Sequence, residues 1–305
     1  MGRRASLVVI TAAYIVALVV ALLWLTWGPS VGQLWADTLI ADILATLVIF
    51  AVSRSVGNSS CYDAYWSVIP VFLALFWWVE GDAIHGGSQA KWRCALLGVV
   101  LVVWAVRLTE NWVRSFPGLV HEDWRYELLR GRAGKFSFLA DLFAIHLIPT
   151  LQVFLAMIPA YVALTRADAG LMWLSVIAFV VGLAAITLES VADRQLRLFR
   201  QSSEPGQTVD IGLWAWSRHP NYLGEFLFWV SILLFGIAAA PADAWWLWIG
   251  AGAMLAMFLG ASIPMMEERS LERRPAYADV IARVPKFLPL PRLSSRTADG
   301  AGRPG

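Results

Sequence analysis

The chain has 305 residues, of which 59% are hydrophobic and 15% charged, and its formal net charge is +2. A soluble domain carries roughly a quarter charged residues, so this composition excludes an ordinary soluble fold. The small net charge also argues against a nucleic-acid partner, which requires a strongly basic surface.

Long apolar runs recur along the whole chain. Several are shorter than the ~20 residues that a helix needs to cross a bilayer, so we expect their ends to include flanking semi-polar residues. The sequence predicts an all-α polytopic membrane helix bundle with about eight transmembrane helices, or seven if one of the shorter runs is re-entrant. In chain order the runs are Ser6–Trp27, Leu34–Val52, Tyr65–Val79, Cys94–Val106, Phe138–Ala163, Leu171–Leu188, Glu225–Ala240 and Trp245–Met265.

The distribution of basic residues predicts the orientation in the membrane. If the N-terminus is cytoplasmic, only Lys91, Arg93 and Arg166 fall on the opposite side, which leaves 21 of the 24 Lys and Arg on the cytoplasmic side. This bias favours an N-in/C-in topology with an even number of helices. The first run is too long for a signal peptide and no A-x-A site follows it, so we expect it to remain as a span.

No motif of common soluble-enzyme chemistry is present. The sequence has no Cys/His cluster with metal-ligand spacing, no G-x-S-x-G and no P-loop. We therefore expect no metal site, and we expect any nucleotide to be held by something other than a Rossmann domain. Cys61 and Cys94 fall near opposite faces of the membrane in this topology, which predicts that they form no disulfide.

The sixth run continues into a stripe of charged residues. Glu189, Asp193, Arg197 and Arg200 are spaced by 4, 4 and 3 positions, so they share one narrow face of a helix. Arginines at the water end suit phosphates, and carboxylates deeper in the membrane suit ribose or amide protons. The alternative is a salt-bridged helix end that follows the positive-inside rule.

The next polar cluster lies at the mouth of the seventh span. The stretch Gly212–Trp229 reads GLWAWSRHPNYLGEFLFW, and its polar residues are Arg218, His219, Asn221, Tyr222 and Glu225. Bilayers penalise such groups unless they find partners, so their density predicts a polar ligand at the membrane surface. The alternative is a helix cap with interfacial Arg, Tyr and Trp.

Two weaker candidate sets complete the polar pattern. Glu267 follows the last span, with Tyr277 shortly after it, and a solvated helix face is the alternative for this segment. In the N-terminal half, Asp63 and Tyr65 open the third run, where we expect them to line a substrate cavity. For most other polar residues of that half, helix capping or interhelical bonding is the simpler interpretation.

The string W-A-W-S-R-H-P-N-Y-L-G-E at Trp214–Glu225 resembles the signature of the steroid 5-alpha-reductase C-terminal family. Most of all it resembles the mainly bacterial branch called domain of unknown function 1295. Further similarity lies in Glu189 with Ala192-Asp193-Arg194-Gln195, in Arg107-Leu-Thr, in Glu122-Asp123-Trp124-Arg125-Tyr126 and in Pro275-Ala-Tyr277.

This resemblance implies a helical membrane bundle whose C-terminal half binds NADPH from the cytosolic side and whose N-terminal half encloses a lipid. By motif position, Asp193, Arg200, Asn221 and Glu225 match residues that hold the cofactor in the steroid reductases. Those enzymes place a catalytic tyrosine three residues before the arginine that Arg107 matches. Here that position is Trp104.

The same R-H-P-x-Y-x-G string, followed by Glu267 and Glu268, is also similar to the isoprenylcysteine carboxyl methyltransferases. In that family these motifs bind S-adenosylmethionine. The two resemblances share a scaffold and differ in the cofactor.

Together these observations predict an N-terminal substrate half (1–136), a C-terminal cofactor half (137–290) and a disordered tail (291–305). The expected function is NADPH-dependent reduction of an activated C=C bond in a lipid taken from the bilayer. An S-adenosylmethionine-dependent methyltransferase and a non-catalytic lipid-binding protein are the alternatives. The candidate catalytic residues are Asp63 and Tyr65, and the candidate cofactor residues are Glu189, Asp193, Arg197, Arg200, Arg218, His219, Asn221, Tyr222, Glu225, Glu267 and Tyr277.

Overall fold

The computed structural model of the protein describes residues 1–204 and 206–288, which are helical and include no strand. The predicted disordered tail, 291–305, lies outside the described residues. The longer helices are α1 (Arg3–Trp27), α2 (Leu34–Val56), α3 (Tyr65–Glu80), α4 (Ser88–Ser115), α7 (Ile148–Thr165), α8 (Met172–Ser202), α9 (Pro220–Ala239), α10 (Ala244–Met257) and α11 (Ile263–Arg273). The shorter ones are η1 (Ser59–Tyr62), η2 (Asp82–His85), α5 (Trp124–Ala133), η3 (Gly134–Phe136), α6 (Ser137–Leu139), η4 (Ala140–Leu147), η5 (Gly212–Ala215), η6 (Pro241–Asp243), η7 (Phe258–Ser262) and α12 (Tyr277–Arg283).

Eight helical segments of the described chain are long and apolar enough to cross a membrane. They are Arg3–Trp27, Leu34–Val56, Ser59–Glu80, Ser88–Ser115, Trp124–Thr165, Met172–Ser202, Pro220–Ala239 and Pro241–Arg273. The prediction of eight spans, and not seven, is confirmed. The short apolar runs reach spanning length because flanking polar residues continue the same helices, as expected. The protein is a multi-pass membrane protein.

Two of the spans contain π-helical turns that the sequence did not predict. η4 lies between α6 and α7, and η7 joins α10 to α11. A π turn inserts an extra residue into a helix, and such turns often occur at functional sites. In η4 the turn brings the buried His146 within 2.8 Å of the carbonyl oxygen of Asp141 through its Nδ1. His146 is therefore a bonded core histidine.

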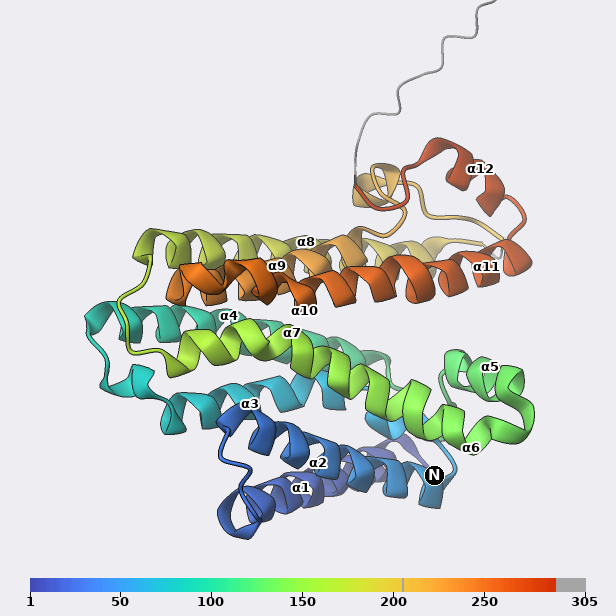
Figure 1. The fold of residues 1–305 in the computed structure, drawn as a ribbon. Helices are drawn as coiled ribbons and strands as arrows, with labels where there is room; N and C mark the ends of the chain where they lie inside the picture. Colours follow the sequence, from blue (N-terminus) through green and yellow to red (C-terminus); the bar gives the residue numbers. More distant parts are fainter. Residues whose placement is uncertain (205, 289–305) are drawn as a thin grey trace, which may run out of the picture.

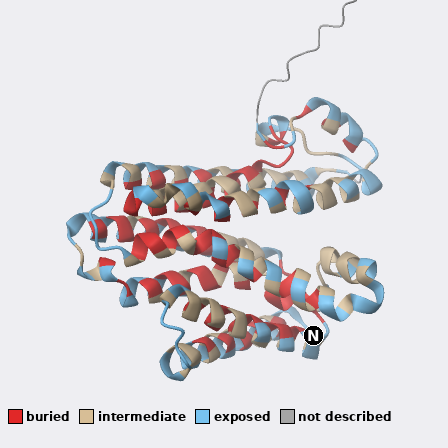
Figure 2. Cartoon of the chain, in the orientation of Figure 1, coloured by how far each residue is buried: buried red, intermediate tan, exposed pale blue. Residues whose placement is uncertain are grey.

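The helices form layers around a central group (Figure 1). α7 packs against α2 and α3 on one side and against α9 and α10 on the other, and α8 packs against both α9 and α4. Helices α1 and α2 pack together at the edge of the bundle. Buried residues gather on the middle helices (Figure 2), whereas α1 exposes large apolar side chains along its length. Exposed apolar side chains of this density suit contact with lipid tails.

The N-terminus lies at the same end of the bundle as α5, α11 and α12 (Figure 1). This common end agrees with an even number of spans. That this end faces the cytoplasm, and that residue 136 divides a substrate half from a cofactor half, remain predictions.

One of the few cations at the opposite end has a structural role. Arg93 is only 1% exposed. Its guanidinium donates to the carbonyl oxygens of Ala163 (3.2 Å), Arg166 (2.6 Å), Asp168 (2.9 Å) and Ala169 (3.2 Å). The last carbonyls of a helix lack intrahelical partners. Arg93 thus binds carbonyls at the end of α7 and in the loop that leads to α8.

Helices α8 and α9 approach each other closely at a glycine. A Cβ atom added to Gly224 would lie 2.7 Å from the Cβ of Glu189 and 2.9 Å from its backbone nitrogen. Only a glycine leaves room for this contact. The close approach brings Glu189 of α8 next to the N-terminal turns of α9, where Asn221 and Glu225 lie.

We predict that Gly224→Ala destabilises the protein by about 1–3 kcal/mol, because the backbone of α8 cannot move aside without disturbing its packing. Gly98→Ala is the matched control, since a Cβ at Gly98 meets no atom within 4 Å. The control is expected to be neutral or to stabilise by up to about 1 kcal/mol through helix propensity. Thermal unfolding in detergent measures both variants, and equal melting temperatures would contradict the prediction.

Candidate functional site

An arginine of α4 lies opposite the charged stripe of α8. Arg107 forms ion pairs with Glu189 and with Asp193, the latter at 2.8 Å. One turn further along α4, the Asn111 amide donates to Asp193 at 3.3 Å and accepts from Arg197 at 2.8 Å. We call these five residues the α4–α8 cluster. Three residues of the predicted stripe, Glu189, Asp193 and Arg197, thus face α4, whereas Arg200 forms no hydrogen bond or ion pair with it. The deep carboxylates have a cation, as buried charges require.

Glu225 of α9 extends this cluster. It is 7% exposed, and its two carboxyl oxygens accept hydrogen bonds from the indole nitrogens of Trp104 and Trp229, each at 2.9 Å. The ring of Trp104 also stacks on Phe228, with centroids 4.3 Å apart. Trp104, at the position that the resemblance matches to a catalytic tyrosine, is thus fully buried and holds Glu225. An indole N–H is a hydrogen-bond donor only.

Asn221, one turn before Glu225, has an incomplete set of partners. Its side-chain oxygen is buried and accepts no hydrogen bond from any described residue. A buried acceptor without a donor costs about 1–3 kcal/mol, so a ligand that donates an N–H or O–H here would be favoured. Asn221 lies close enough to Asp193 for the two side chains to interact. The sequence predicted Asn221 and Glu225 on one face of α9.

Arg218 and His219 hold the C-terminal segment against the start of α9. Arg218 is 6% exposed, and its guanidinium donates to Glu267 (2.7 Å) and to the carbonyl oxygens of Val284 (2.7 Å) and Ile281 (3.2 Å). The imidazole of His219 lies 3.1 Å from the same oxygen of Glu267. These three candidates come together, but their polar atoms face one another. Their contact with a cofactor remains a prediction.

Of the two candidate tyrosines, Tyr222 lies in the first turn of α9 and Tyr277 begins α12. Tyr222 packs edge-on against Phe258 and His219, with centroids 5.1 and 5.9 Å apart. Tyr277 is buried in a small cluster with Val280 and Val284. Burial, with Glu267 nearby, raises the pKa of Tyr277 to about 12, so its phenol is neutral at physiological pH.

Two further arginines lie beside a hollow at the end of α8. Arg200 forms no ion pair or direct hydrogen bond with the described residues. It lies close enough to Arg274 for the two guanidinium groups to repel each other, and Asp193 is near enough to attract it more weakly. Arg274 donates to the carbonyl oxygen of Gln207 at 3.4 Å. We call a hollow formed by neighbouring residues the arginine pocket, after the two arginines near it, although neither arginine lines it. Its volume is about 630 Å³, and it is lined by Phe199, Gly206, Gln207, Thr208, Asp210 and Ala276.

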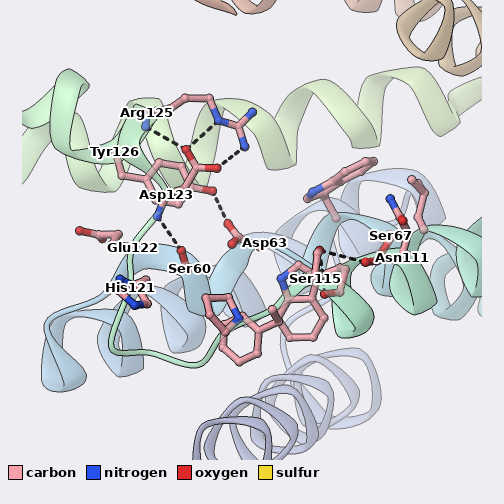
Figure 3. A pocket seen from close by; sticks show the side chains of 15 residues that line it. Ser60, Asp63, Ser67, Asn111, Ser115, His121, Glu122, Asp123, Arg125 and Tyr126 are labelled. Atoms are coloured by element: carbon pink, nitrogen blue, oxygen red, sulfur yellow. Dashed lines mark hydrogen bonds and ion pairs between the residues drawn. The ribbon is translucent and has the colours of Figure 1, made fainter. Parts of the chain in front are cut away.

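A second cavity, of about 400 Å³, lies in the N-terminal half (Figure 3). Asp63 lies in its wall, where its carboxylate accepts a hydrogen bond of 2.6 Å from the phenol of Tyr126. We call it the Asp63 cavity. Tyr65 does not line it, because its hydroxyl donates to the buried Asp42 at 2.8 Å. Of the two predicted catalytic residues, the structure places only Asp63 in a cavity.

The segment around α5 supplies residues that the candidate set missed. Asp123 caps α5 by accepting a hydrogen bond from the backbone nitrogen of Arg125 (2.8 Å). The guanidinium of Arg125 donates two more hydrogen bonds to the same carboxylate, at 2.9 and 2.7 Å. Burial alone would raise the pKa of Asp123, but these bonds bring it below its usual value. Asp123, Arg125 and Tyr126 all belong to the sequence motif E-D-W-R-Y. This motif could have identified them as candidates from the sequence. Asn111 lines this cavity as well as contacting Asp193, so it joins the Asp63 cavity to the α4–α8 cluster.

We predict that Arg107→Met destabilises the protein by about 3–5 kcal/mol, because it leaves Glu189 and Asp193 buried without a cation. Arg114→Met on the same helix is the control. Arg114 pairs with Glu110 at an exposed position, where such a pair contributes about 0.5 kcal/mol or less. Chemical or thermal unfolding in detergent distinguishes the two, and similar losses in both variants would show that the α4–α8 cluster is not a stabilising contact.

Comparison with known proteins supports the resemblance seen in the sequence. The chain is 28% identical to the uncharacterized protein C594.04c of Schizosaccharomyces pombe, over 79% of this chain and 76% of that relative. No solved structure matches it significantly. The family model described as "Protein of unknown function (DUF1295)" matches residues 49–284, which include every candidate site residue given above. The chain therefore belongs to the DUF1295 family.

Proposed function

We propose that the protein is a membrane reductase that uses NADPH to reduce an activated C=C bond of a lipid. The main support for this proposal is the proximity of two arginines, Arg200 and Arg274. These two guanidinium groups repel each other, and neither forms an ion pair with a carboxylate among the described residues. Phe199, next to Arg200, and Gln207, whose carbonyl oxygen accepts from Arg274, line the arginine pocket of about 630 Å³. Such a pair of arginines is stabilised by an anion, and phosphate accepts hydrogen bonds from arginine in a forked geometry.

The charge of this pair favours a dinucleotide over S-adenosylmethionine. The methyl donor is cationic at sulfur and carries no phosphate, so two unpaired arginines would oppose its binding. NADPH carries three phosphate groups, and it therefore suits the arginine pocket. We therefore propose that the phosphates of NADPH lie beside Arg200 and Arg274.

Residues at the start of α9 suit the other end of such a cofactor. The buried side-chain oxygen of Asn221 lacks a donor, and a carboxamide group such as that of nicotinamide supplies one. Asp193 and Glu225 provide further acceptors for amide or ribose protons. The residues present thus fit the cofactor at both its anionic and its amide-bearing parts.

When bound, the cofactor would supply the hydride for the reduction. The contribution of the chain is orientation and exclusion of water. Trp104, Phe228 and Trp229 are each almost fully buried around Glu225, and they form an apolar wall beside the acceptors. Electrostatic interactions are stronger in such a dry environment than in water.

The proposed site lies at the end of the bundle that holds the N-terminus and most of the basic residues (Figure 1). By the positive-inside rule this end is cytoplasmic, where NADPH is available. Because the sequence resembles a mainly bacterial branch, we propose the bacterial inner membrane as its location.

One observation favours a second candidate function, lipid binding without catalysis. Trp104 occupies the position of the reductases' catalytic tyrosine, and its indole N–H already bonds to Glu225. If no other group supplies a proton, the scaffold would retain its pockets and lose the reaction.

Thermal unfolding of the purified protein in detergent tests the cofactor. NADPH at 100 times its dissociation constant is expected to stabilise the protein by about 2.7 kcal/mol, and S-adenosylmethionine is expected to have no effect. Arg200→Gln and Arg274→Gln should each weaken NADPH binding by about 10- to 100-fold, because each removes a charge-assisted hydrogen bond.

Arg166→Gln is the control, because Arg166 follows α7 at the opposite end of the bundle and pairs there with Asp243; this variant should bind NADPH as the unaltered protein does. Stabilisation by S-adenosylmethionine alone would contradict the reductase function and support a methyltransferase. Stabilisation by neither cofactor would favour the lipid-binding candidate.

A further inference from the structure

Helix α2 carries buried polar side chains along one face. Thr38, Asp42, Thr46 and Ser53 are spaced by 4, 4 and 7 positions, so they share this face, and all four are buried. They lie within the membrane span Leu34–Val56, away from the α4–α8 cluster and the arginine pocket. Polar groups inside a span are costly without partners, and an ionisable residue there commonly has a function.

Asp42 is the ionisable residue of this face. Its carboxyl accepts a hydrogen bond from the hydroxyl of Tyr65 at 2.8 Å, and it forms no ion pair with any described residue. The titratable groups around it are the phenols of Tyr62 and Tyr65, with Tyr14 of α1 and His146 of η4 behind them. A buried carboxylate without a cation is far less favourable than a neutral carboxyl group. These surroundings therefore favour the protonated acid.

A series of hydroxyl groups leads from Asp42 toward the end of the bundle that holds the N-terminus. Tyr65 interacts with Thr46 as well as with Asp42. The hydroxyl of Thr46 lies 2.9 Å from that of Thr150 on α7, which lies 2.8 Å from the hydroxyl of Tyr62. We call Tyr65, Thr46, Thr150 and Tyr62 the hydroxyl chain. Each hydroxyl group can donate one hydrogen bond while it accepts another, as the transfer of a proton between neighbours requires.

His146 lies between the hydroxyl chain and water. Its ring contacts that of Tyr62, with centroids 5.1 Å apart. Its two nitrogens lie 3.2 Å from the hydroxyl of Ser53 and 2.8 Å from the carbonyl oxygen of Asp141. Asp141 in turn pairs with Arg54, whose side chain is 50% exposed. Imidazole takes up and releases protons near neutral pH, so His146 suits the outer part of a proton path.

In the opposite direction the polar face of α2 is closed. Thr38 lies one turn from Asp42, but its hydroxyl donates to the carbonyl oxygen of Leu34 and accepts from the indole nitrogen of Trp77, each at 2.9 Å. Trp77 is fully buried, and its ring packs edge-on against Phe154. Asp42 is therefore connected to one end of the bundle only. This arrangement suits a site that binds a proton without conducting protons across the membrane.

We propose that Asp42 is a proton-binding site inside the membrane, and that it exchanges its proton with the end of the bundle that holds the N-terminus through the hydroxyl chain and His146. In each transfer one group loses its O–H or N–H bond as the next group gains one, so Asp42 gains a single proton and the chain is restored. This site is separate from the reductase function proposed above and does not depend on it.

Infrared spectroscopy of the purified full-length protein in detergent, without nucleotide, tests the site. A neutral carboxyl group has a C=O stretching band that a carboxylate lacks. The band of Asp42 is the one that Asp42→Asn removes at neutral pH, and Tyr65→Phe should move it to higher frequency by removing a hydrogen bond to the C=O group. In D2O the same band shifts as the proton is replaced by deuterium, which gives the rate of exchange with water.

Thr150→Val tests the path, because it keeps the shape of the side chain and removes a hydroxyl from the middle of the hydroxyl chain. The band of Asp42 should remain, which shows that its surroundings are intact. Exchange should slow by about 10-fold or more, because it then requires a local opening of the helices. Thr38→Val is the matched control, since it removes a hydroxyl on the other side of Asp42 and should not slow exchange.

Two kinds of result would overturn the proposal. If Asp42→Asn removes no neutral-carboxyl band, Asp42 is ionised and does not bind a proton at neutral pH. If exchange is as fast in Thr150→Val as in the unaltered protein, or slower in Thr38→Val, the proton does not use the hydroxyl chain. Since no nucleotide is present, neither result bears on the binding of NADPH.

Discussion

The ion pairs between Arg107 of α4 and the two carboxylates of α8 connect the main parts of this membrane protein. Glu189 and Asp193 are inside the bundle and would be strongly unfavourable there without a cation. Arg107 thus fixes the position of α8 relative to α4, and Gly224 allows α9 to pack closely on α8. The resulting three-helix contact places Asn221 and Glu225 beside the same charges.

Two groups of arginines near this contact differ in what they bind. Arg218 directs its guanidinium toward Glu267 and two backbone carbonyls, so it stabilises the fold of the C-terminal segment. Arg200 and Arg274 form no ion pair with a carboxylate among the described residues, and they repel each other. The guanidinium of Arg218 thus has protein acceptors for its hydrogen bonds, whereas that of Arg200 has none among the described residues. This difference separates structural from ligand-binding arginines in the proposed function.

The fold was predictable because span length, hydropathy and the distribution of arginines are properties of the sequence itself. The shared face of Glu189, Asp193 and Arg197 was also predictable, since it follows from helical spacing. The partner Arg107 was not, because nothing local relates residues that are more than 80 positions apart. Asp63 and Tyr65 were paired by proximity in the chain, but residues two positions apart on a helix face different directions. Only Asp63 lies in the cavity.

Asn111 belongs both to the wall of the Asp63 cavity and to the α4–α8 cluster, and both ends of its amide are engaged by α8. An occupant that turned this amide would change the hydrogen bonds of Asp193 and Arg197. Binding in the cavity and binding at the end of α8 would then share a coupling free energy, and each ligand would alter the affinity for the other by the same factor. A single carboxamide thus connects the wall of the Asp63 cavity to the charged residues at the end of α8.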